Sequence, residues 1–202
     1  MNVLVGCEFS GKVRDEFRKR RHNAYSCDFL PSEDMEYHLQ GDVLDYLDYP
    51  WDLAIFHPPC TYLCASGLHW NHRTPGRSEK TEEALEFVKT LLNLPIPKIA
   101  LENPVGCIST RLRKWDEMIQ PYHFGDDASK ATCLWLKGLP PLMPTVFASP
   151  RIVLYKGKLV ERWSNQTDSG QNILGPSADR WAERSVTYSG IAKAMAEQWG
   201  VA

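Results

Sequence analysis

The chain lacks both a long apolar run and an excess of charge of one sign. No apolar stretch approaches the roughly 18–20 residues needed to cross a bilayer, so we expect no membrane insertion. Among its 202 residues, 23 are Lys or Arg and 25 are Asp or Glu, which gives a formal net charge of −2. Because a protein that coats DNA is basic overall, any contact with nucleic acid has to be local.

Cysteine is sparse, and its six copies are spread through apolar segments. No signal peptide precedes Met1–Val5, which enters directly into a strand-like run. We therefore expect free thiols in a reducing cytoplasm and no disulfide framework. The hydrophobic share of 43% and the charged share of 24% are typical of a folded globular protein. With no internal repeat or low-complexity tract, residues 1–202 are predicted to form a single domain.

Short apolar runs alternate with helix-like segments in the first half of the chain. This alternation predicts an α/β fold, with a mostly parallel sheet covered by helices on both faces. The predicted strands cover 2–7, 24–28, 51–57, 98–101 and 131–137, and the predicted helices cover 11–21 and 81–94. A hairpin is predicted from 152–155 and 159–162, and a loop followed by a helix from 180–199.

Polar or reactive residues follow the predicted strands directly. In a parallel sheet, functional sites form at the carboxyl ends of the strands. The residues placed there are Glu8-Phe9-Ser10-Gly11, Asp28, Asp42, His57-Pro58-Pro59-Cys60 and Glu102-Asn103-Pro104. These strand ends are therefore the candidate functional site.

Cys60 follows two prolines, which fix the backbone and hold a side chain in one place. A cysteine thiolate is a strong nucleophile, although most free cysteines are buried apolar residues. Glu102 follows an apolar strand, so partial desolvation is expected to raise its pKa and make it a proton donor. An ordinary loop carboxylate is the alternative for Glu102. Two strands of one sheet that end in these residues are able to aim a nucleophile and an acid at one substrate.

Two other patterns bear on ligands. Asp28 and Asp42 end two segments where carboxylates commonly bind ribose or an adenine amino group, although Gly41-Asp42 is also a turn dipeptide. The turn at 8–12 has one glycine, so no pyrophosphate cofactor is expected.

Zinc is a further alternative, because the segment 57–72 is rich in residue types that bind zinc, but the spacing of these residues fits no standard zinc finger. The His and Cys residues of that segment are His57, Cys60, Cys64, His69 and His72.

Basic residues cluster twice, and solvated helix faces are the favoured interpretation, with local nucleic-acid contact as the alternative. The clusters are Arg14, Arg18, Lys19, Arg20 and Arg21, and then Arg111, Arg113 and Lys114.

These motifs together resemble the cytosine-C5 methyltransferase family, in a short form found among phage and prophage proteins. Pro58-Pro59-Cys60 resembles the catalytic Pro-Cys motif, and Glu102-Asn103-Pro104 resembles the Glu-Asn-Val motif. Phe9-Ser10-Gly11 is similar to the first cofactor-binding motif, and Tyr188–Ala196 is similar to the last one. The motifs also occur in the family's order along the chain.

The resemblance implies a Rossmann-like S-adenosylmethionine-dependent methyltransferase that methylates cytosine at carbon 5 through a covalent cysteine adduct. It implies catalytic roles for Cys60, Glu102, Pro59 and Asn103. The residues implied to bind S-adenosylmethionine are Phe9, Ser10, Gly11, Asp28, Asp42, Pro58 and Ala192. Arg73, Arg180 and Arg184 are candidates to hold a phosphate or a base edge.

The sequence departs from the family at two places that concern the substrate. Ser129-Lys130-Ala131-Thr132 stands about where the family has a Gln-x-Arg-x-Arg strand. The target-recognition domain is missing or reduced to a small variable insert at 144–178. The substrate is therefore either cytosine in DNA or a free nucleotide such as dCMP. A regulatory protein that binds S-adenosylmethionine without turnover is the alternative outside enzyme chemistry.

Overall fold

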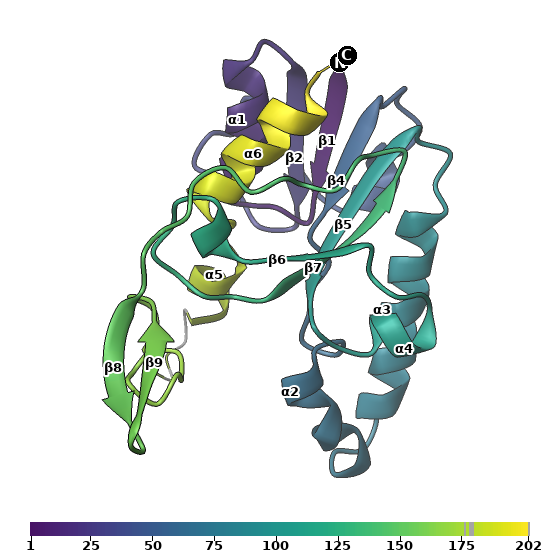
Figure 1. Ribbon diagram of the computed structural model, residues 1–202. Coiled ribbons are helices and arrows are strands. Elements are labelled where there is room, and N and C mark those ends of the chain that lie inside the picture. Colours follow the sequence, from purple (N-terminus) through teal and green to yellow (C-terminus); the bar gives the residue numbers. More distant parts are fainter. Residues whose placement is uncertain (176, 178–179, 202) are drawn as a thin grey trace.

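The computed structural model describes residues 1–175, 177 and 180–201. Its centre is a seven-stranded sheet in the order β3-β2-β1-β4-β5-β7-β6 (Figure 1). Within this sheet β7 runs antiparallel to β5 and β6, whereas the pairs among β1 to β5 are parallel. The strands are β1 (Asn2–Gly6), β2 (Asn23–Asp28), β3 (His38–Gln40), β4 (Leu53–Phe56), β5 (Lys98–Pro104), β6 (Glu117–Ile119) and β7 (Thr132–Lys137).

Helices cover both faces of this sheet. Helices α1 (Lys12–Lys19) and α6 (Ser189–Trp199) pack side by side on one face, and α3 (Arg77–Leu92) packs on the other (Figure 1). The short helices are α2 (Ala65–Leu68), α4 (Ile108–Arg111) and α5 (Arg180–Ser185), with 3-10 turns η1 (Val43–Tyr46), η2 (His69–His72) and η3 (Pro121–His123). The predicted α/β fold, Rossmann-like with a mostly parallel sheet and helices on both faces, is confirmed.

The burial of β4 explains why its sequence reads as a continuous apolar run. All four of its residues are buried, because helices lie over both faces of the strand. Leu53 and Ile55 join the core beneath α1 and α6, whereas Ala54 and Phe56 join the core beneath α3. None of the helices in the described part of the chain is both long enough and apolar enough to cross a membrane.

Several predicted boundaries differ from the structure. Helix α3 begins at Arg77, before the predicted start at Thr81, and residues 180–185 form α5 where a loop was predicted. Strand β5 continues through Glu102 and Asn103, which pair with β7 residues, although these positions were predicted to follow the strand. The short strands β3 and β6 were not predicted, because three residues carry too little periodicity to identify them.

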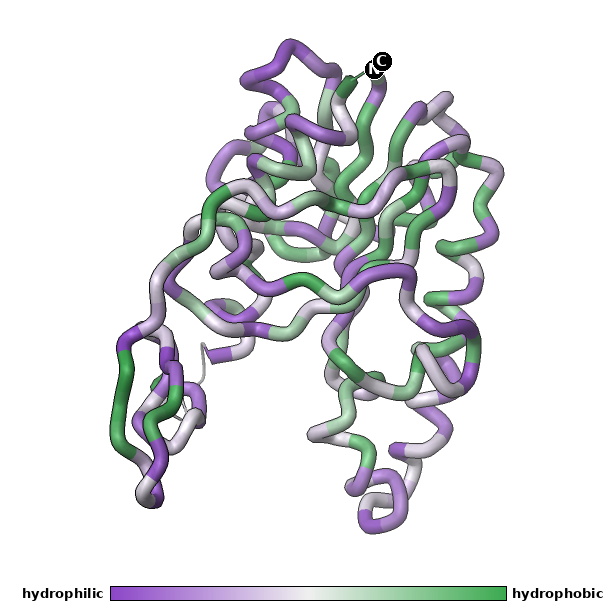
Figure 2. Tube along the Cα trace, in the orientation of Figure 1, coloured by the Kyte–Doolittle hydropathy of each residue, from purple (hydrophilic) through white to green (hydrophobic). Residues whose placement is uncertain are grey.

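The predicted hairpin is confirmed by the antiparallel pair β8 (Arg151–Tyr155) and β9 (Lys158–Arg162). It projects away from the large sheet (Figure 1), and apolar residues run along both of its strands (Figure 2). Ile152, Leu154 and Leu159 are 58%, 71% and 74% exposed. We refer to residues 144–175 as the hairpin arm. Residues 176 and 178 of the predicted insert at 144–178 lie outside the described residues.

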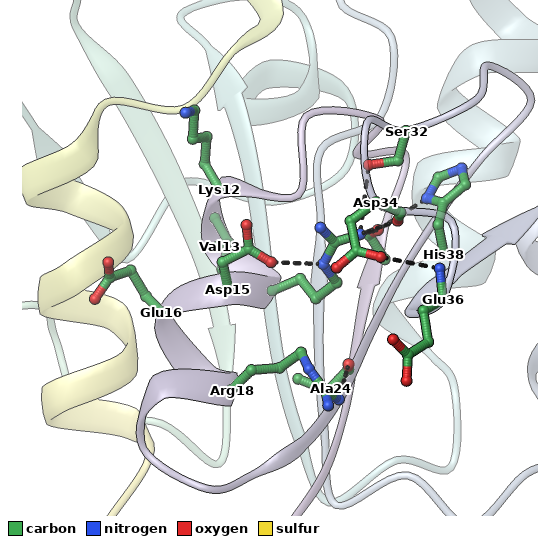
Figure 3. Close-up of polar contacts among 12 residues, drawn as sticks. Lys12, Val13, Asp15, Glu16, Arg18, Ala24, Ser32, Asp34, Glu36 and His38 are labelled. Carbon is green, nitrogen blue, oxygen red and sulfur yellow. Dashed lines mark hydrogen bonds and ion pairs between the residues drawn. The ribbon is translucent and has the colours of Figure 1, made fainter.

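The first basic cluster is not a uniformly solvated helix face, so that interpretation is wrong for Arg14. The Arg14 side chain is buried and donates hydrogen bonds to Ser26, to Ser32 and to the backbone oxygen of Asp34. It also pairs with Asp15 at 2.8 Å. Figure 3 shows Asp15, Ser32 and Asp34 among the residues of this network. Arg14 therefore ties α1 to the segment that follows β2 and is unable to contact DNA.

Candidate active site

Three central strands bring their carboxyl ends together. Gly6 of β1 lies beside Phe56 of β4, and Phe56 lies beside Leu101 of β5. The residues that follow these three positions are therefore neighbours across the sheet. The N–H of His57 confirms the alignment, because it donates to the backbone oxygen of Gly6 at 2.9 Å. This is the edge at which the sequence predicted a site.

The turn after β4 carries Cys60 and is held from below by β5. Pro58 is buried, Pro59 is exposed, and Cys60 is half-buried. Asn103, which is 1% exposed, donates from Nδ2 to the backbone oxygen of Pro58 at 2.8 Å. Asn103 thus fixes the position of the Pro-Pro-Cys turn, which is a positioning role for this predicted site residue.

The segment after β5 closes over the same turn. The N–H of Cys107 donates to the oxygen of Leu63 at 2.9 Å, and Cys64 forms an isolated bridge with Gly106. A Cβ atom on Gly106 would overlap the carbonyl oxygen of Leu63. Only glycine allows this close backbone approach, so the cysteine-bearing turn and the segment after Glu102 form one packed unit.

Glu102 is ionised, so the predicted raised pKa is wrong. Burial by itself raises the pKa of Glu102, but the positive charge of Lys130 and the hydrogen bond from His57 outweigh it and lower this pKa to about 2. His57 Nδ1 donates to Glu102 Oε2 at 2.7 Å, and the two side chains are 7% and 14% exposed. Glu102 is therefore a hydrogen-bond acceptor that has to obtain a proton before it donates one.

Cys60 and Cys64 act as a pair one helical turn apart. The N–H of Cys64 donates to the backbone oxygen of Cys60 at 3.0 Å. A hydrogen bond between the two thiols raises the pKa of Cys60 and lowers the pKa of Cys64, to which the Ser66 hydroxyl and the N–H groups of Ser66 and Gly67 contribute. Lys130 lowers the pKa of Cys60 and Glu102 raises it, so Cys60 lies within electrostatic reach of both groups.

The carboxylates after β2 and β3 surround the turn after β1. Asp28 and Asp42 both raise the pKa of Cys7, after the larger effect of burial, so both lie close to this turn. Asp28 Oδ1 accepts the N–H of Leu30 at 2.9 Å, and Asp42 Oδ1 accepts the N–H of Leu44 at 3.0 Å. Each carboxylate keeps a second oxygen outside these bonds. This pair of acceptors beside a tight turn fits a ligand with hydroxyl and amino groups.

The remaining predicted cofactor residues start α1 and line its approach. Gly11 precedes α1 with a φ of 68°, a conformation that favours glycine. Ser10 donates from Oγ to Glu8 Oε1 at 3.3 Å, and the ring of Phe9 lies 6.4 Å from that of Trp181 on α5. Ala192 is only 1% exposed inside the core, so its side chain packs between elements.

The three candidate arginines do not gather at one point. Arg73 follows η2, where its guanidinium lies 5.9 Å from the ring of Trp70. Arg180 and Arg184 lie on α5, and the backbone oxygen of Arg184 accepts a hydrogen bond from Lys130 Nζ at 3.0 Å. The arginines therefore belong to two separate elements at the carboxyl end of the sheet.

Sequence reasoning placed His57 at this sheet edge but did not foresee that His57, Lys130 and Thr132 act on Glu102. The hydroxyl of Thr132 also lowers the pKa of Glu102. Lys130 and Thr132 come from the segment that stands in place of the family's Gln-x-Arg-x-Arg strand, so this departure was itself a signal. A cavity of about 10 Å³ beside Glu102 is lined by Lys130, Thr132, Thr187, Tyr188, Ile191 and Met195.

A second hollow and the zinc alternative lie outside this chemistry. A hollow of about 420 Å³ opens near β2 and η1, where Tyr25, Tyr46 and Trp51 contribute to its wall. It contains none of the predicted site residues. Within the part of the chain that the structure describes, no three His, Cys, Asp or Glu side chains gather closely enough to hold a metal ion.

Comparison with known proteins finds likeness only among solved structures. No protein-family model matches the chain, and no curated protein matches it. A solved structure from E. coli, described as a DNA modification methyltransferase encoded within a prophage, is 14% identical with a TM-score of 0.45. The match covers 73% of this chain and 52% of that chain, so the chain spans about half the length of that protein. A likeness this weak carries no argument, so the fold is described from the strand order of the sheet alone.

Proposed function

We propose that this protein is an enzyme that methylates cytosine at carbon 5 with S-adenosylmethionine, through a covalent adduct on Cys60. One observation carries the proposal. A half-buried cysteine follows β4 and a carboxylate lies on the adjacent strand β5, within electrostatic reach of each other, and Asn103 binds the turn that carries the cysteine. A nucleophile and a hydrogen-bonding acid at one sheet edge are the two groups that this reaction requires.

The turns after β1, β2 and β3 are the proposed cofactor site. Asp28 and Asp42 offer carboxylate oxygens for ribose hydroxyls and an adenine amino group, and Gly11 lets the chain turn closely beneath the ligand. Phe9, Ser10, Pro58 and Ala192 complete the proposed site, Ala192 through the packing of α6. When bound, S-adenosylmethionine supplies an electrophilic methyl group.

The chemistry assigned to the chain begins at Cys60. Its thiolate attacks carbon 6 of cytosine, forms a carbon–sulfur bond and makes carbon 5 nucleophilic. The electron pair displaced from the ring reaches nitrogen 3, where a proton delivered through Glu102 neutralises it. After carbon 5 is methylated, a general base accepts the carbon-5 proton, the thiolate leaves and the ring regains its double bond. Pro59 and Asn103 keep the nucleophile in place during these steps.

The proposed substrate is cytosine in DNA, with free dCMP as the alternative. The hairpin arm stands in place of a target-recognition domain and carries lysines at its tip, which suit phosphate contacts. Arg73, Arg180 and Arg184 are proposed to bind phosphates or the base edge. In a duplex, the cytosine has to be flipped out of the stack before Cys60 reaches it, at a cost of a few kcal/mol.

The direct test is transfer of label from S-adenosylmethionine to plasmid DNA or to dCMP. We expect labelled 5-methylcytosine in DNA. Label in dCMP alone would move the same chemistry to the nucleotide. Binding of S-adenosylmethionine with label in neither substrate would overturn the enzyme proposal in favour of a regulatory binding protein.

The nucleophile is tested with DNA that contains 5-fluorocytosine, which traps the adduct. We expect wild-type protein and Cys64→Ser to form a covalent complex, and Cys60→Ser to form none. Cys64→Ser is a matched control, since it removes the neighbouring thiol on the same turn. If Cys64→Ser alone prevents the adduct, the nucleophile is Cys64.

A further inference from the structure

His57 lies between two buried carboxylates at the end of β4. On one side its Nδ1 donates to Glu102 Oε2 at 2.7 Å. On the other side of β4, strand β1 leads into Glu8, which is 5% exposed. Burial raises the pKa of Glu8, and the largest opposing effect comes from His57. The three adjacent strands β1, β4 and β5 therefore each contribute one titratable group to a single row.

Two atoms in this row are buried without a partner. Among the described residues, neither Glu8 Oε2 nor His57 Nε2 has a hydrogen-bond partner. The other oxygen of Glu8 accepts the N–H of Val13 at 2.8 Å and the hydroxyl of Ser10 at 3.3 Å. A buried carboxylate oxygen and a buried imidazole nitrogen are costly to leave unpaired. Both costs fall when the imidazole carries a proton on each nitrogen, because the added positive charge also attracts the nearby Glu8 carboxylate.

The proposed reaction needs such a proton. Glu102 is ionised next to Lys130 and His57, so it has no proton of its own to pass to nitrogen 3. Lys130 is the other cation near Glu102, but its Nζ donates to the backbone oxygen of Arg184 at 3.0 Å. His57 is directly bonded to the carboxylate, and an imidazole gives and takes protons near neutral pH.

We propose that Glu8, His57 and Glu102 form a buried proton-holding row, in which His57 stores the proton that Glu102 delivers to the cytosine ring. This inference deepens the proposed function and rests on it. As Cys60 bonds to carbon 6, the proton moves from His57 Nδ1 to Glu102 and from Glu102 to nitrogen 3. When the thiolate leaves, the proton returns by the same route. Glu8 balances the charge of the imidazolium, so His57 and Glu8 are positioning residues that act through Glu102.

The row titrates as one unit, so its pH dependence is set by all the groups that face it. These groups are Glu8 and Ser10 from the turn after β1, Glu102 from β5, and Lys130 and Thr132 from the start of β7. On this proposal, Glu8→Gln is expected to make His57 lose its proton at lower pH, because a nearby carboxylate favours the protonated imidazole.

The first measurement is the kcat of methyl transfer from pH 5 to pH 9. In wild type, kcat should fall as the pH rises and His57 loses its proton. His57→Asn keeps an N–H donor near the Nδ1 position but stores no proton. We therefore expect kcat to drop about 100-fold. The alkaline limb, which is the fall in kcat with rising pH, should vanish, and the affinity for S-adenosylmethionine should not change. Glu8→Gln should move the limb to lower pH. His57→Asn with the wild-type kcat and pH profile would overturn the proposal.

The second measurement does not depend on activity. Nitrogen-15 NMR of histidine-labelled protein follows the protonation of His57, whose signals are identified by their loss in His57→Asn. We expect an imidazolium whose pKa falls in both Glu8→Gln and Glu102→Gln. A neutral ring throughout the range overturns the proton store even if methyl transfer occurs. An imidazolium in a protein that transfers no methyl group supports the row and overturns only the proposed function.

His22 provides the matched histidine control. It lies just before β2, at the amino end of the sheet and thus opposite the site, where its Nδ1 contacts the amino group of Met1 at 3.4 Å. His22→Asn is expected to keep the wild-type kcat and pH profile. A changed profile in His22→Asn would show that the pH dependence of kcat does not report on His57. The pH dependence would then no longer support the proposal.

Discussion

The ends of β4 and β5 and the hairpin arm are built in opposite ways. At the strand ends, polar side chains are buried and bonded at short distances, as between His57 and Glu102 at 2.7 Å. In the hairpin arm, Leu154 and Leu159 are 71% and 74% exposed. The arm is attached at its base, where Trp163 stacks on Tyr122 at 4.1 Å.

This difference suggests a division of labour. A buried hydrogen-bonded site holds reacting groups in a fixed geometry, which bond formation at a ring carbon requires. An exposed hairpin that leaves apolar and cationic side chains in solvent suits contact with a large partner such as DNA. If the division is real, changes at the strand ends affect chemistry and stability together. Changes in the arm affect only the binding of a large substrate.

The largest expected effect concerns the stability that Glu102 contributes. Its pKa is about 2 in the fold against an ordinary value of 4.5, so folding favours its ionised form. This stability is fully present above pH 4.5 and is lost as the pH falls toward 2. The shift corresponds to about 3 kcal/mol. Urea unfolding of wild type and Glu102→Gln should show a difference that shrinks as the pH falls.

Glu117 on β6 provides a control of opposite sign. Burial raises the pKa of Glu117, so its ionised form is disfavoured in the fold. Relative to Glu117→Gln, wild type should therefore lose stability as the pH rises. A pH-independent difference between wild type and Glu102→Gln would contradict the ionised state of Glu102.

The next effect compares two asparagines, one from each region. Asn103→Ala leaves the oxygen of Pro58 without its buried donor, so we expect a loss of about 2 kcal/mol in unfolding free energy. The freed turn should also slow adduct formation by Cys60 about 100-fold. Asn165→Ala breaks two bonds to the backbone of Ser129 at the base of the arm. It should destabilise the protein by about 1 kcal/mol.

The measurements are the unfolding free energy in denaturant and the rate at which Cys60 forms an adduct with 5-fluoro-dCMP. This nucleotide is too small to contact the hairpin arm while it lies at Cys60. Asn165→Ala should trap this nucleotide at the wild-type rate. Equal slowing in both variants would break the division between the two regions.

The smallest expected effect is at the hairpin tip. Lys156→Ala with Lys158→Ala should weaken DNA binding about 10-fold at 0.1 M salt and reduce the salt dependence by roughly two counterions. Stability and the trapping of the nucleotide should not change, because both side chains are exposed. The control is Lys19→Ala with Lys89→Ala, which removes the same charge from α1 and α3. If both pairs weaken binding equally, the hairpin has no special role in DNA contact.

The sheet was predictable because its strands carry strong local signals. The four buried residues of β4 form an uninterrupted apolar run that ends at two prolines, so both the strand and its carboxyl end were visible. The hairpin was visible because Lys156-Gly157-Lys158 separates two β-branched segments. The three-residue strands β3 and β6 offered no such period, and pairing with their neighbours alone defines them.

The site was predictable in its parts but not in its charges. Cys60 and Glu102 were identified by their places after strands, yet the ionised state of Glu102 depends on Lys130 and His57. Lys130 is far from Glu102 in sequence, and no local sequence pattern predicts that its charge acts on Glu102. His57 was considered as a zinc ligand, because its bond to Glu102 exists only once β4 lies beside β5.

The reversed direction of β7 affects how the molecule can be altered. A parallel strand brings its last residues to the edge that carries Cys60, whereas β7 brings its first, so this edge receives Thr132, the first residue of β7, and Lys130 just before the strand. The polar groups that lower the pKa of Glu102 therefore precede residue 133, and the hairpin arm comes later along the chain. The arm is in effect an exchangeable module, and an engineer is able to lengthen or replace it without interrupting the segments that carry the reacting groups.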